Sequence, residues 1–170
     1  YISVIEHGFD IVSSLAENFP EFKIVFKPHI EEDKKLVDRV MSAANTHQNI
    51  YLSSVGSKYA DVYNSASIMV SDFSSTAYTF AISTKRPVLF FSHNEKVLQN
   101  KLANNEYCIN RERVGVVTSN LSHLVRDTSK LLGDQDHYER IICSFVDENI
   151  FNFGESSNRC VDKICSIVGV

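Results

Sequence analysis

Glycine is scarce in this sequence, and its scarcity excludes the usual ways in which a chain wraps a phosphate group. Only six glycines occur among 170 residues. Neither the G-x-G-x-x-G pattern of dinucleotide-binding folds nor the G-x-x-x-x-G-K-[ST] pattern of the P-loop can be built from them. If the chain binds a nucleotide, the phosphates must rest on hydroxyl groups and on the backbone N–H groups of a helix N-terminus.

Positive charge is also in short supply. The sequence carries 17 Lys and Arg residues against 21 Asp and Glu residues, which gives a formal net charge of −4. A protein that follows a nucleic-acid backbone needs a basic stripe to neutralise it, so we expect no nucleic-acid partner. No apolar run approaches the length of about 20 residues that crosses a bilayer, and no signal peptide is recognisable. We therefore expect a cytoplasmic protein.

Metal-binding patterns are absent as well. The four cysteines form no Cys-x-x-Cys pair and have no metal-ligand spacing with histidine. Cys143, Cys160 and Cys165 fall within apolar helical patterns, which predicts buried free thiols in a reducing compartment. We expect no metal ion and no other cofactor.

The organisation of the chain is simple. A length of 170 residues fits one domain of ordinary size, and no repeat, low-complexity tract or linker divides it. We expect residues 1–170 to form a single domain. A chain that opens on Tyr1 rather than on Met, close to regular structure, is typical of a piece of a longer protein.

What the sequence does contain is a strand–turn–helix–strand unit over residues 67–91. The apolar run 68–70 has the length of a buried strand, and helical spacing of apolar residues follows over 77–84. Pro87 ends that helix, and the run 88–91 predicts the next buried strand. Three hydroxyl residues stand where the helix begins: Ser74, Ser75 and Thr76.

These hydroxyl groups have two interpretations. Ser and Thr are preferred N-cap residues, so they could do no more than begin the helix. A helix N-terminus is also a ready site for an anion. Ligands of open α/β sheets bind at the carboxyl ends of strands, and this position favours the second interpretation.

A second polar group follows another predicted strand. The segment 22–26 alternates as a strand does and ends at Lys27-Pro28-His29, where proline should stop ladder pairing. A lysine and a histidine at that edge could neutralise a diphosphate or protonate a leaving oxygen. His29 is therefore the candidate catalytic residue. A histidine that merely ends a strand is the alternative.

Strands and helices alternate along the chain, which predicts an α/β fold with a Rossmann-like, mostly parallel sheet covered by helices on both faces. Strands are expected at 22–26, 50–52, 68–70, 88–91 and 114–117. Helices are expected at 9–16, 31–44, 57–65, 77–84, 121–132, 137–146 and 156–168. Between residues 92 and 113 we expect a polar loop with room for one helix near 96–102.

Three motifs together resemble the CDP-glycerol glycerophosphotransferases, the teichoic-acid polymerase family. The motifs are Lys27-Pro28-His29, Ser71-Asp72-Phe73-Ser74-Ser75 and Gly154-x-Ser-Ser-x-Arg159. Their order and spacing match over nearly the whole chain, and the middle motif is the specific one. The resemblance implies the C-terminal, donor-nucleotide half of a GT-B fold, in which two Rossmann-like halves enclose the active site.

The resemblance also implies roles for residues. It places His29 at the donor diphosphate and Ser74 and Ser75 on the donor phosphates, without a metal. Thr79 stands where the family usually carries an acidic residue that holds the donor ribose, which leaves the donor open between CDP, UDP and other nucleotides. The candidate donor-binding residues are Lys27, Ser74, Ser75, Thr76, Thr79 and Arg159.

Further parts of the family pattern have no counterpart in the sequence. The first strand of this half and the N-terminal, acceptor-binding half with its Trp-His-Gly histidine are missing. The resemblance therefore implies a separate acceptor domain, a membrane-linked acceptor reached through it, and a place at the inner face of the membrane. The product would be a cell-wall teichoic acid or a capsule polysaccharide.

Two other functions stay open from sequence. The chain could be the nucleotide-binding half of a hexosyltransferase or of a nucleotide-sugar epimerase, which share the half-fold. It could also be a non-catalytic Rossmann-like binding module, in which Ser74 and Ser75 serve only as caps.

Overall fold

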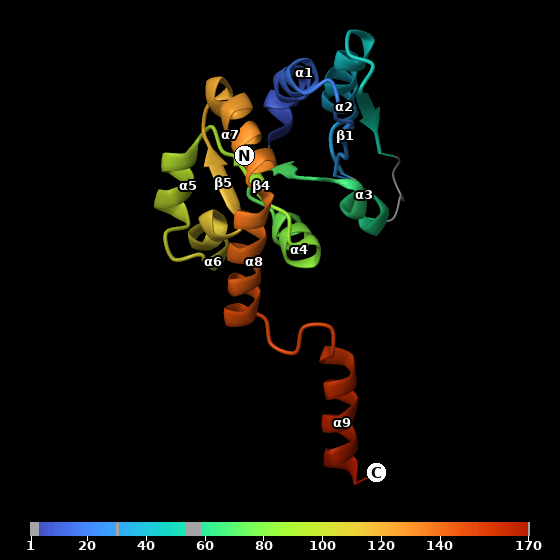
Figure 1. The fold of residues 1–170 in the computed structure, drawn as a ribbon, viewed down its shortest axis with the longest axis vertical. Coiled ribbons are helices and arrows are strands. Elements are labelled where there is room, and N and C mark those ends of the chain that lie inside the picture. The colour runs from blue at the N-terminus through green and yellow to red at the C-terminus, as the bar shows by residue number, and fades with distance from the viewer. Residues whose placement is uncertain (1–3, 30, 54–58, 170) are drawn as a thin grey trace.

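The computed structural model describes residues 4–29, 31–53 and 59–169, and in it helices surround short parallel strands (Figure 1). The first elements are η1 (Val4–His7), α1 (Gly8–Asn18), β1 (Ile24–Phe26), α2 (Lys34–Met41), η2 (Ser42–Asn45), β2 (Ile50–Leu52) and α3 (Tyr59–Ser65). Next come β3 (Met69–Ser71), α4 (Ser75–Thr84), β4 (Val88–Phe91), α5 (Glu95–Lys101), α6 (Glu106–Ile109) and η3 (Asn110–Arg113). The last are β5 (Gly115–Thr118), α7 (Leu121–Gly133), α8 (Gln135–Asn149) and α9 (Ser156–Val168). The predicted α/β, Rossmann-like class is confirmed.

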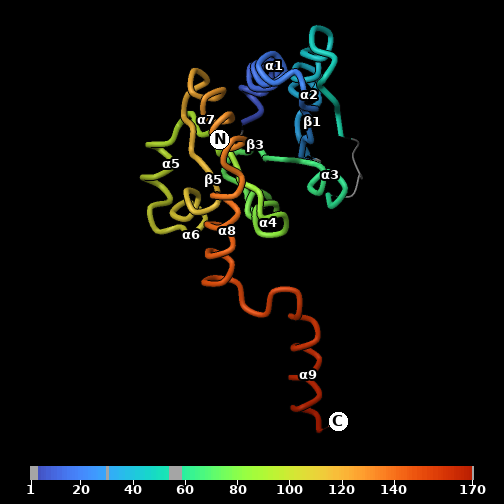
Figure 2. The backbone as a smooth tube through the Cα atoms, viewed as in Figure 1, coloured from blue at the N-terminus to red at the C-terminus, as the bar shows by residue number. Residues whose placement is uncertain are grey.

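The strands form two parallel sheets rather than the single sheet that the sequence predicts. β1 pairs with β2, with Ile24 opposite Ile50. β3, β4 and β5 form the second sheet in that order, with Ser71 opposite Phe90. Within the described parts of the chain, β1 and β3 do not pair. In Figure 2 the trace of β1 lies near α1, whereas β3 runs from α3 toward the centre of the molecule.

The main core is built around β4. All four of its residues are at most 2% exposed. Because successive side chains of a strand point to opposite faces, this burial means that both faces of the sheet are covered. Helices α4 and α7 both contact β4. They contribute the fully buried Phe80, Leu124 and Leu131.

A smaller apolar cluster lies under α1 and α2, beside the β1–β2 sheet. Its buried members are Ile5, Val12, Ala16, Val40, Ala43 and Ile50. A Cβ atom on Gly8 would lie 2.6 Å from Cγ2 of Val40, so only glycine allows α1 to start this close to α2.

The helix α4 has well-defined ends. Ser74 is its N-cap, and Lys85 ends it in the left-handed conformation with φ of 59°. The Nζ of Lys85 donates to the carbonyl of Ile82, as expected of a cation at a helix C-terminus. Arg86 instead reaches the end of α3, where it donates to the carbonyls of Asn64 and Ala66.

Several predicted boundaries differ from the structure, and the helix expected at 31–44 is α2 from Lys34 to Met41 followed by η2. The segment 92–113 is helical over much of its length, through α5, α6 and η3, rather than a polar loop with one helix. Its short helical turns have no apolar period to reveal them, and tertiary contacts hold them instead. The helix expected at 57–65 is present as α3 from Tyr59, and its first two residues lie outside the described residues.

Helix α9 extends away from the rest of the molecule (Figure 1), and none of its described residues is buried. The prediction of buried thiols is therefore wrong: Cys160 is exposed, and Cys143 and Cys165 are half-buried. The apolar spacing is real, but the described part of the chain does not cover that face. The N-cap of α9 is Glu155, whose side chain makes no capping hydrogen bond.

Candidate functional site

The N-terminus of α4 follows the carboxyl end of β3, as the sequence predicts. Ser74 takes an extended conformation, with φ of −137°, and its hydroxyl accepts a hydrogen bond from the Thr76 N–H at 3.2 Å. The capping interpretation is thus confirmed for Ser74. Its role toward a phosphate stays a prediction, and so does that of Thr76, which is half-buried.

Ser75 and Thr79 lie one helical turn apart on the exposed side of α4. The Thr79 hydroxyl donates to the carbonyl of Ser75 at 3.3 Å. Both residues line a cavity of about 400 Å³ beside the helix, a volume in the range of small-molecule sites. The structure therefore brings together two of the predicted donor-binding residues.

The walls of this cavity, named here the α4 cavity, come from three elements. Helix α4 adds Tyr78 and Ile82, the segment of α6 and η3 adds Glu106, Tyr107 and Asn110, and the end of α8 adds Phe145, Asn149 and Ile150. Apolar rings and amide groups thus face the same space. Flat heterocycles with polar edges suit such a lining.

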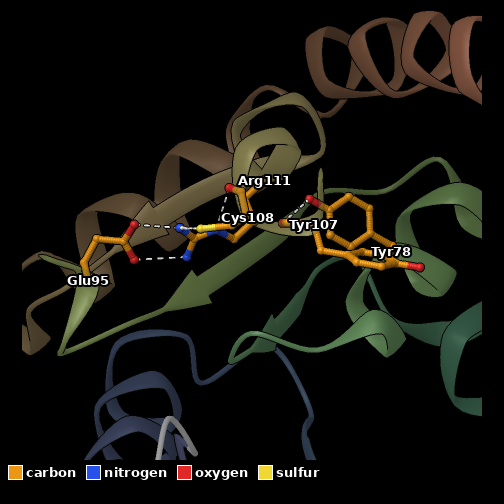
Figure 3. Close-up of polar contacts among 5 residues, drawn as sticks. All are labelled: Tyr78, Glu95, Tyr107, Cys108 and Arg111. Atoms are coloured by element: carbon orange, nitrogen blue, oxygen red, sulfur yellow. Dashed lines mark hydrogen bonds and ion pairs between the residues drawn. The ribbon is translucent and has the colours of Figure 1, made fainter. Parts of the chain in front are cut away.

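One polar contact fixes the aromatic wall. The Tyr78 hydroxyl donates to the carbonyl of Tyr107 at 2.6 Å, and the two rings meet edge to face with centroids 5.1 Å apart (Figure 3). Burial raises the pKa of Tyr78 above its ordinary value, so the phenol stays protonated and keeps donating.

The Lys27-Pro28-His29 motif follows β1 at the carboxyl end of the other sheet. His29 is exposed, and its Nδ1 accepts a hydrogen bond from the Glu31 N–H at 3.3 Å. In the neutral ring the proton then sits on Nε2, which can donate to a ligand. The Nζ of Lys27 lies 4.4 Å from the ring centroid of Tyr59, a cation–π contact. Neither Lys27 nor His29 lines the α4 cavity.

Arg159 is not brought to these residues. It lies on α9, the helix that extends away from the sheets, and pairs loosely with Glu155 at 3.8 Å on an exposed surface. Its donor-binding role stays a prediction without support from the geometry.

A buried ion pair in the segment 92–113 escaped the sequence reasoning. The Arg111 guanidinium makes two hydrogen bonds to the Glu95 carboxylate, at 2.6 and 3.0 Å, and lies 3.3 Å from Sγ of Cys108 (Figure 3). Burial disfavours the charged Glu95, but hydrogen bonds from Arg111 outweigh it and lower the pKa of Glu95. The pair anchors the segment that carries Tyr107, and so positions a wall of the α4 cavity.

That ion pair borders a second cavity of about 450 Å³, on the side of α5 and β5. Its lining residues are Glu95, Gln99, Ala103, Cys108, Ile109, Arg111, Glu112, Val117 and Ser119. None of the predicted site residues lines this cavity. Two of the charged groups that line it, Glu95 and Arg111, are already paired with each other, which favours a structural role for them.

The structure also brings together two histidines that belong to none of the sequence motifs. The ring centroids of His7 and His93 are 4.6 Å apart. Nothing in the sequence pairs residues so distant along the chain. The available signal is that each stands at a turn, His7 before the helix α1 and His93 after the strand β4.

Comparison with known protein families identifies the family of this chain. The family model described as CDP-glycerol:poly(glycerophosphate) glycerophosphotransferase matches residues 3–166. The chain belongs to this glycerophosphotransferase family. The resemblance drawn from the three motifs is confirmed.

A curated relative agrees with this family assignment. The chain is 30% identical over 138 residues to the minor teichoic acid biosynthesis protein GgaB of Bacillus subtilis (strain 168). The match covers 81% of this chain and 14% of GgaB, so the chain spans about a seventh of that relative. No solved structure matches the chain.

Two kinds of feature are absent from the described residues of the chain. Among the residues that the structure describes, no three His, Cys, Asp or Glu side chains are grouped closely enough to hold a metal ion. In the same residues, no helix has the length and apolar character needed to span a membrane.

Proposed function

We propose that this chain is the donor-nucleotide-binding part of a GT-B-type transferase. It would help to move glycerol phosphate, or a related sugar or polyol phosphate, from a CDP-activated donor to a teichoic-acid-type polymer. Membership of the glycerophosphotransferase family supports this proposal. The observation that carries it is the α4 cavity, in which Ser75 and Thr79 meet apolar rings and amide groups.

The α4 cavity suits the nucleoside. Tyr78, Tyr107 and Phe145 offer apolar faces to the base, and the amides of Asn110 and Asn149 can meet its polar edge. The exposed hydroxyl of Thr79 can hydrogen-bond the ribose, so Thr79 would replace the usual acidic residue.

The donor phosphates would then lie at the N-terminus of α4. A helix N-terminus carries partial positive charge and unpaired N–H groups, both of which favour an anion. Since the Ser74 hydroxyl already caps the helix, we assign Ser74 to positioning those groups and Ser75 to direct contact.

His29 would act in the transfer itself. The acceptor hydroxyl oxygen forms a bond to the phosphorus that bears glycerol. The bond from that phosphorus to the bridging oxygen breaks, and CMP leaves. Nε2–H of His29 can donate to the bridging oxygen as negative charge develops there. Lys27, two residues earlier, would offset the charge of the diphosphate.

The rest of the enzyme follows from this assignment. The acceptor and its base would belong to a separate domain, which would give access to a membrane-linked acceptor at the inner face of the membrane. The transfer replaces the phosphoanhydride bond of the donor with a phosphodiester bond and changes no oxidation state, so it requires no redox cofactor. The 170-residue chain alone should then bind donor nucleotide without transferring anything.

One observation favours a second candidate. The Ser74 hydroxyl is engaged in the cap of α4, which is what a non-catalytic binding module would also require. The hexosyltransferase and epimerase alternatives draw support only from Thr79, which leaves the ribose contact unlike that of the family.

Calorimetric titration of the chain with CDP, UDP and cytidine tests the proposal. We expect weak binding of CDP, lowered about ten- to hundredfold in the double variant Ser75→Ala/Thr79→Val, because hydrogen bonds to a phosphate and to the ribose are lost. Ser122→Ala is the matched control, since Ser122 is an exposed serine in the first turn of α7. Absence of CDP binding, or equal binding by the double variant, would refute the proposal. Stronger binding of UDP than of CDP would reassign the donor.

A further inference from the structure

His7 and His93 form a compact pair between two elements that are remote in sequence. His7 ends η1 and is the N-cap of α1, whereas His93 follows β4. Their ring planes meet at 61°, with the centroids 4.6 Å apart. The His7 ring also lies 5.5 Å from that of Phe91, the last residue of β4. The pair is thus seated at the end of the central strand.

This position is the same edge of the sheet from which α4 begins. Strands β3 and β4 are parallel neighbours, with Ser71 opposite Phe90, so the chain leaves both strands at one edge. Asp72, which follows β3, holds η1 at that edge, because its Oδ2 accepts a hydrogen bond from the Val4 N–H at 3.3 Å. The two imidazoles and the start of α4 therefore share the carboxyl edge where ligands of α/β sheets bind.

The chemistry of the pair suits an anion. Each imidazole can donate an N–H to a ligand oxygen. Asn94 Nδ2 lies 2.6 Å from Nε2 of His93. If the amide donates there, the His93 proton sits on Nδ1, where it can be offered to a ligand. The eleven-residue helix α1 begins beside the pair without a side-chain cap, which adds partial positive charge.

A metal ion is the other ligand that two imidazoles attract, but it needs further protein ligands. Structural zinc sites have four and catalytic sites three. In the described ranges, these histidines belong to no group of three side chains able to hold a metal. The nearby carboxylate of Asp72 already accepts a hydrogen bond from the Val4 N–H.

We propose that His7 and His93 bind the phosphoryl oxygens of a nucleoside diphosphate. The inference rests on the proposed function, in which the α4 cavity takes the nucleoside part of the same ligand. Each imidazole donates one hydrogen bond to a non-bridging phosphate oxygen. This histidine pair supplies hydrogen-bond donors where other nucleotide-binding sheets use the N–H groups of glycine-rich loops and lysine side chains.

The test titrates the chain with inorganic pyrophosphate, CDP and cytidine in a calorimeter. We expect His7→Gln and His93→Gln each to weaken pyrophosphate and CDP binding about tenfold or more, since a charge-assisted hydrogen bond is lost. Cytidine binding should stay unchanged. His123→Gln, an exposed histidine on α7, is the matched control and should bind all three as the unaltered chain does.

Proton NMR provides a measurement that does not depend on how the variants fold. Pyrophosphate should shift the imidazole signals of His7 and His93 in the unaltered chain and leave that of His123 in place.

The outcomes separate the two proposals. If both glutamine variants bind CDP normally, or if the two imidazole signals do not move, the histidine site is wrong while the proposed function stands. If the chain binds pyrophosphate through the pair but binds neither CDP nor cytidine, the pair is a diphosphate site without a nucleoside, and the proposed function fails. If none of the three binds, both are wrong.

Discussion

The two sheets of this protein have the same parallel pairing but very different surroundings. In the β3–β4–β5 sheet the central strand is buried on both faces. In the β1–β2 sheet, Val25, Tyr51 and Leu52 are 43%, 45% and 49% exposed. Strands of similar length and composition thus differ in cover rather than in pairing. We infer that the three-stranded sheet carries most of the stability, because buried apolar area is the main source of it.

The difference bears directly on the proposed site. Ser75, Thr79 and His93 are fixed to the well-covered sheet, whereas Lys27 and His29 follow a strand of the less covered one. Segments with few buried contacts open locally at lower free-energy cost. Nucleotide binding and phosphoryl transfer would therefore depend on different parts of the molecule. Variants in the two sheets should therefore affect binding, transfer and stability differently, and the largest effect is expected at His29.

The first prediction concerns His29 and activity. In an enzyme that contains both this chain and the acceptor domain, His29→Ala should lower kcat about 10²–10⁴-fold, the usual range for a positioned acid or base. Stability should hardly change, because the side chain is exposed and leaves no cavity. The measurement is kcat beside melting temperature, with His123→Ala as control. Near-normal turnover, or loss of activity only through unfolding, would make His29 a structural residue.

The second prediction compares one aromatic residue from each sheet. Phe90→Ala should destabilise the protein by about 3–5 kcal/mol, because it empties a fully buried position. Tyr51→Ala, on β2, should cost far less, since its ring is nearly half exposed. Denaturant unfolding of both variants provides the measurement. Equal losses would show that the two sheets share the stability, against the division drawn here.

Much of the well-covered sheet could be predicted, and the reason is its burial. The run 88–91 is wholly apolar, so β4 is found at the predicted residues. A strand that is buried on both faces is recognisable in a sequence as a continuous apolar run. The separation into two sheets has no such sequence signal, because it depends on what lies between β1 and β3 in space.

The site was predictable only in its local parts. The turn after β3 and the cap by Ser74 follow from neighbouring residues, and both are found. The α4 cavity also needs Asn149 from α8, and the imidazole pair joins His7 to His93. Contacts between residues so far apart in the chain are set by tertiary packing. No periodicity or spacing in the sequence predicts them. Arg111 is a further example, since its partner Glu95 lies in another short helix.

The third prediction compares two ion pairs. Glu95→Gln should destabilise the protein by about 3 kcal/mol, because it leaves the buried Arg111 guanidinium without a counter-charge. The pKa of Glu95 is lowered in the folded state, so its contribution is present above the ordinary glutamate pKa and is lost as pH falls through the lower folded pKa. Unfolding measured from pH 7 to pH 3 should show this loss in the unaltered protein and not in Glu95→Gln.

Glu148→Gln is the control for that series. Glu148 is exposed and its partner Arg113 is partly exposed, so solvent screens the pair. Its unfolding midpoint should stay where it is. A Glu95→Gln variant as stable as Glu148→Gln would mean that the buried pair does not hold the 106–113 segment.

The fourth prediction separates capping from ligand contact at Ser74. Ser74→Ala should lower stability by about 1 kcal/mol, the usual cost of a lost N-cap. Asn120→Ala should cost about as much, because Asn120 caps α7 by accepting from the Ser122 N–H at 2.7 Å. Only Ser74→Ala should also weaken CDP binding, since only α4 begins at the proposed site. Equal CDP affinity in the two variants would leave Ser74 as a cap and nothing more.

The smallest effect is expected at Asp72, the residue that joins η1 to the end of β3. Burial raises the pKa of Asp72, more than the hydrogen bond from the Val4 N–H lowers it. The folded state therefore binds this proton more tightly than the unfolded state does. Stability should decline as pH rises from the ordinary aspartate pKa through the raised folded pKa, the opposite direction to that of Glu95.

Asp72→Asn keeps an oxygen acceptor for Val4 and removes the buried charge, so it should make the protein slightly more stable at pH 7. The gain should vanish near pH 3, where Asp72 is already protonated in both states. Asp33→Asn is the matched control, since Asp33 accepts a backbone N–H from Lys35 at the start of α2 but is exposed. Its unfolding midpoints should follow those of the unaltered protein throughout. If Asp72→Asn is less stable than the unaltered protein at pH 7, the carboxylate charge itself holds η1 against the three-stranded sheet, and the two regions are coupled more tightly than their burial suggests.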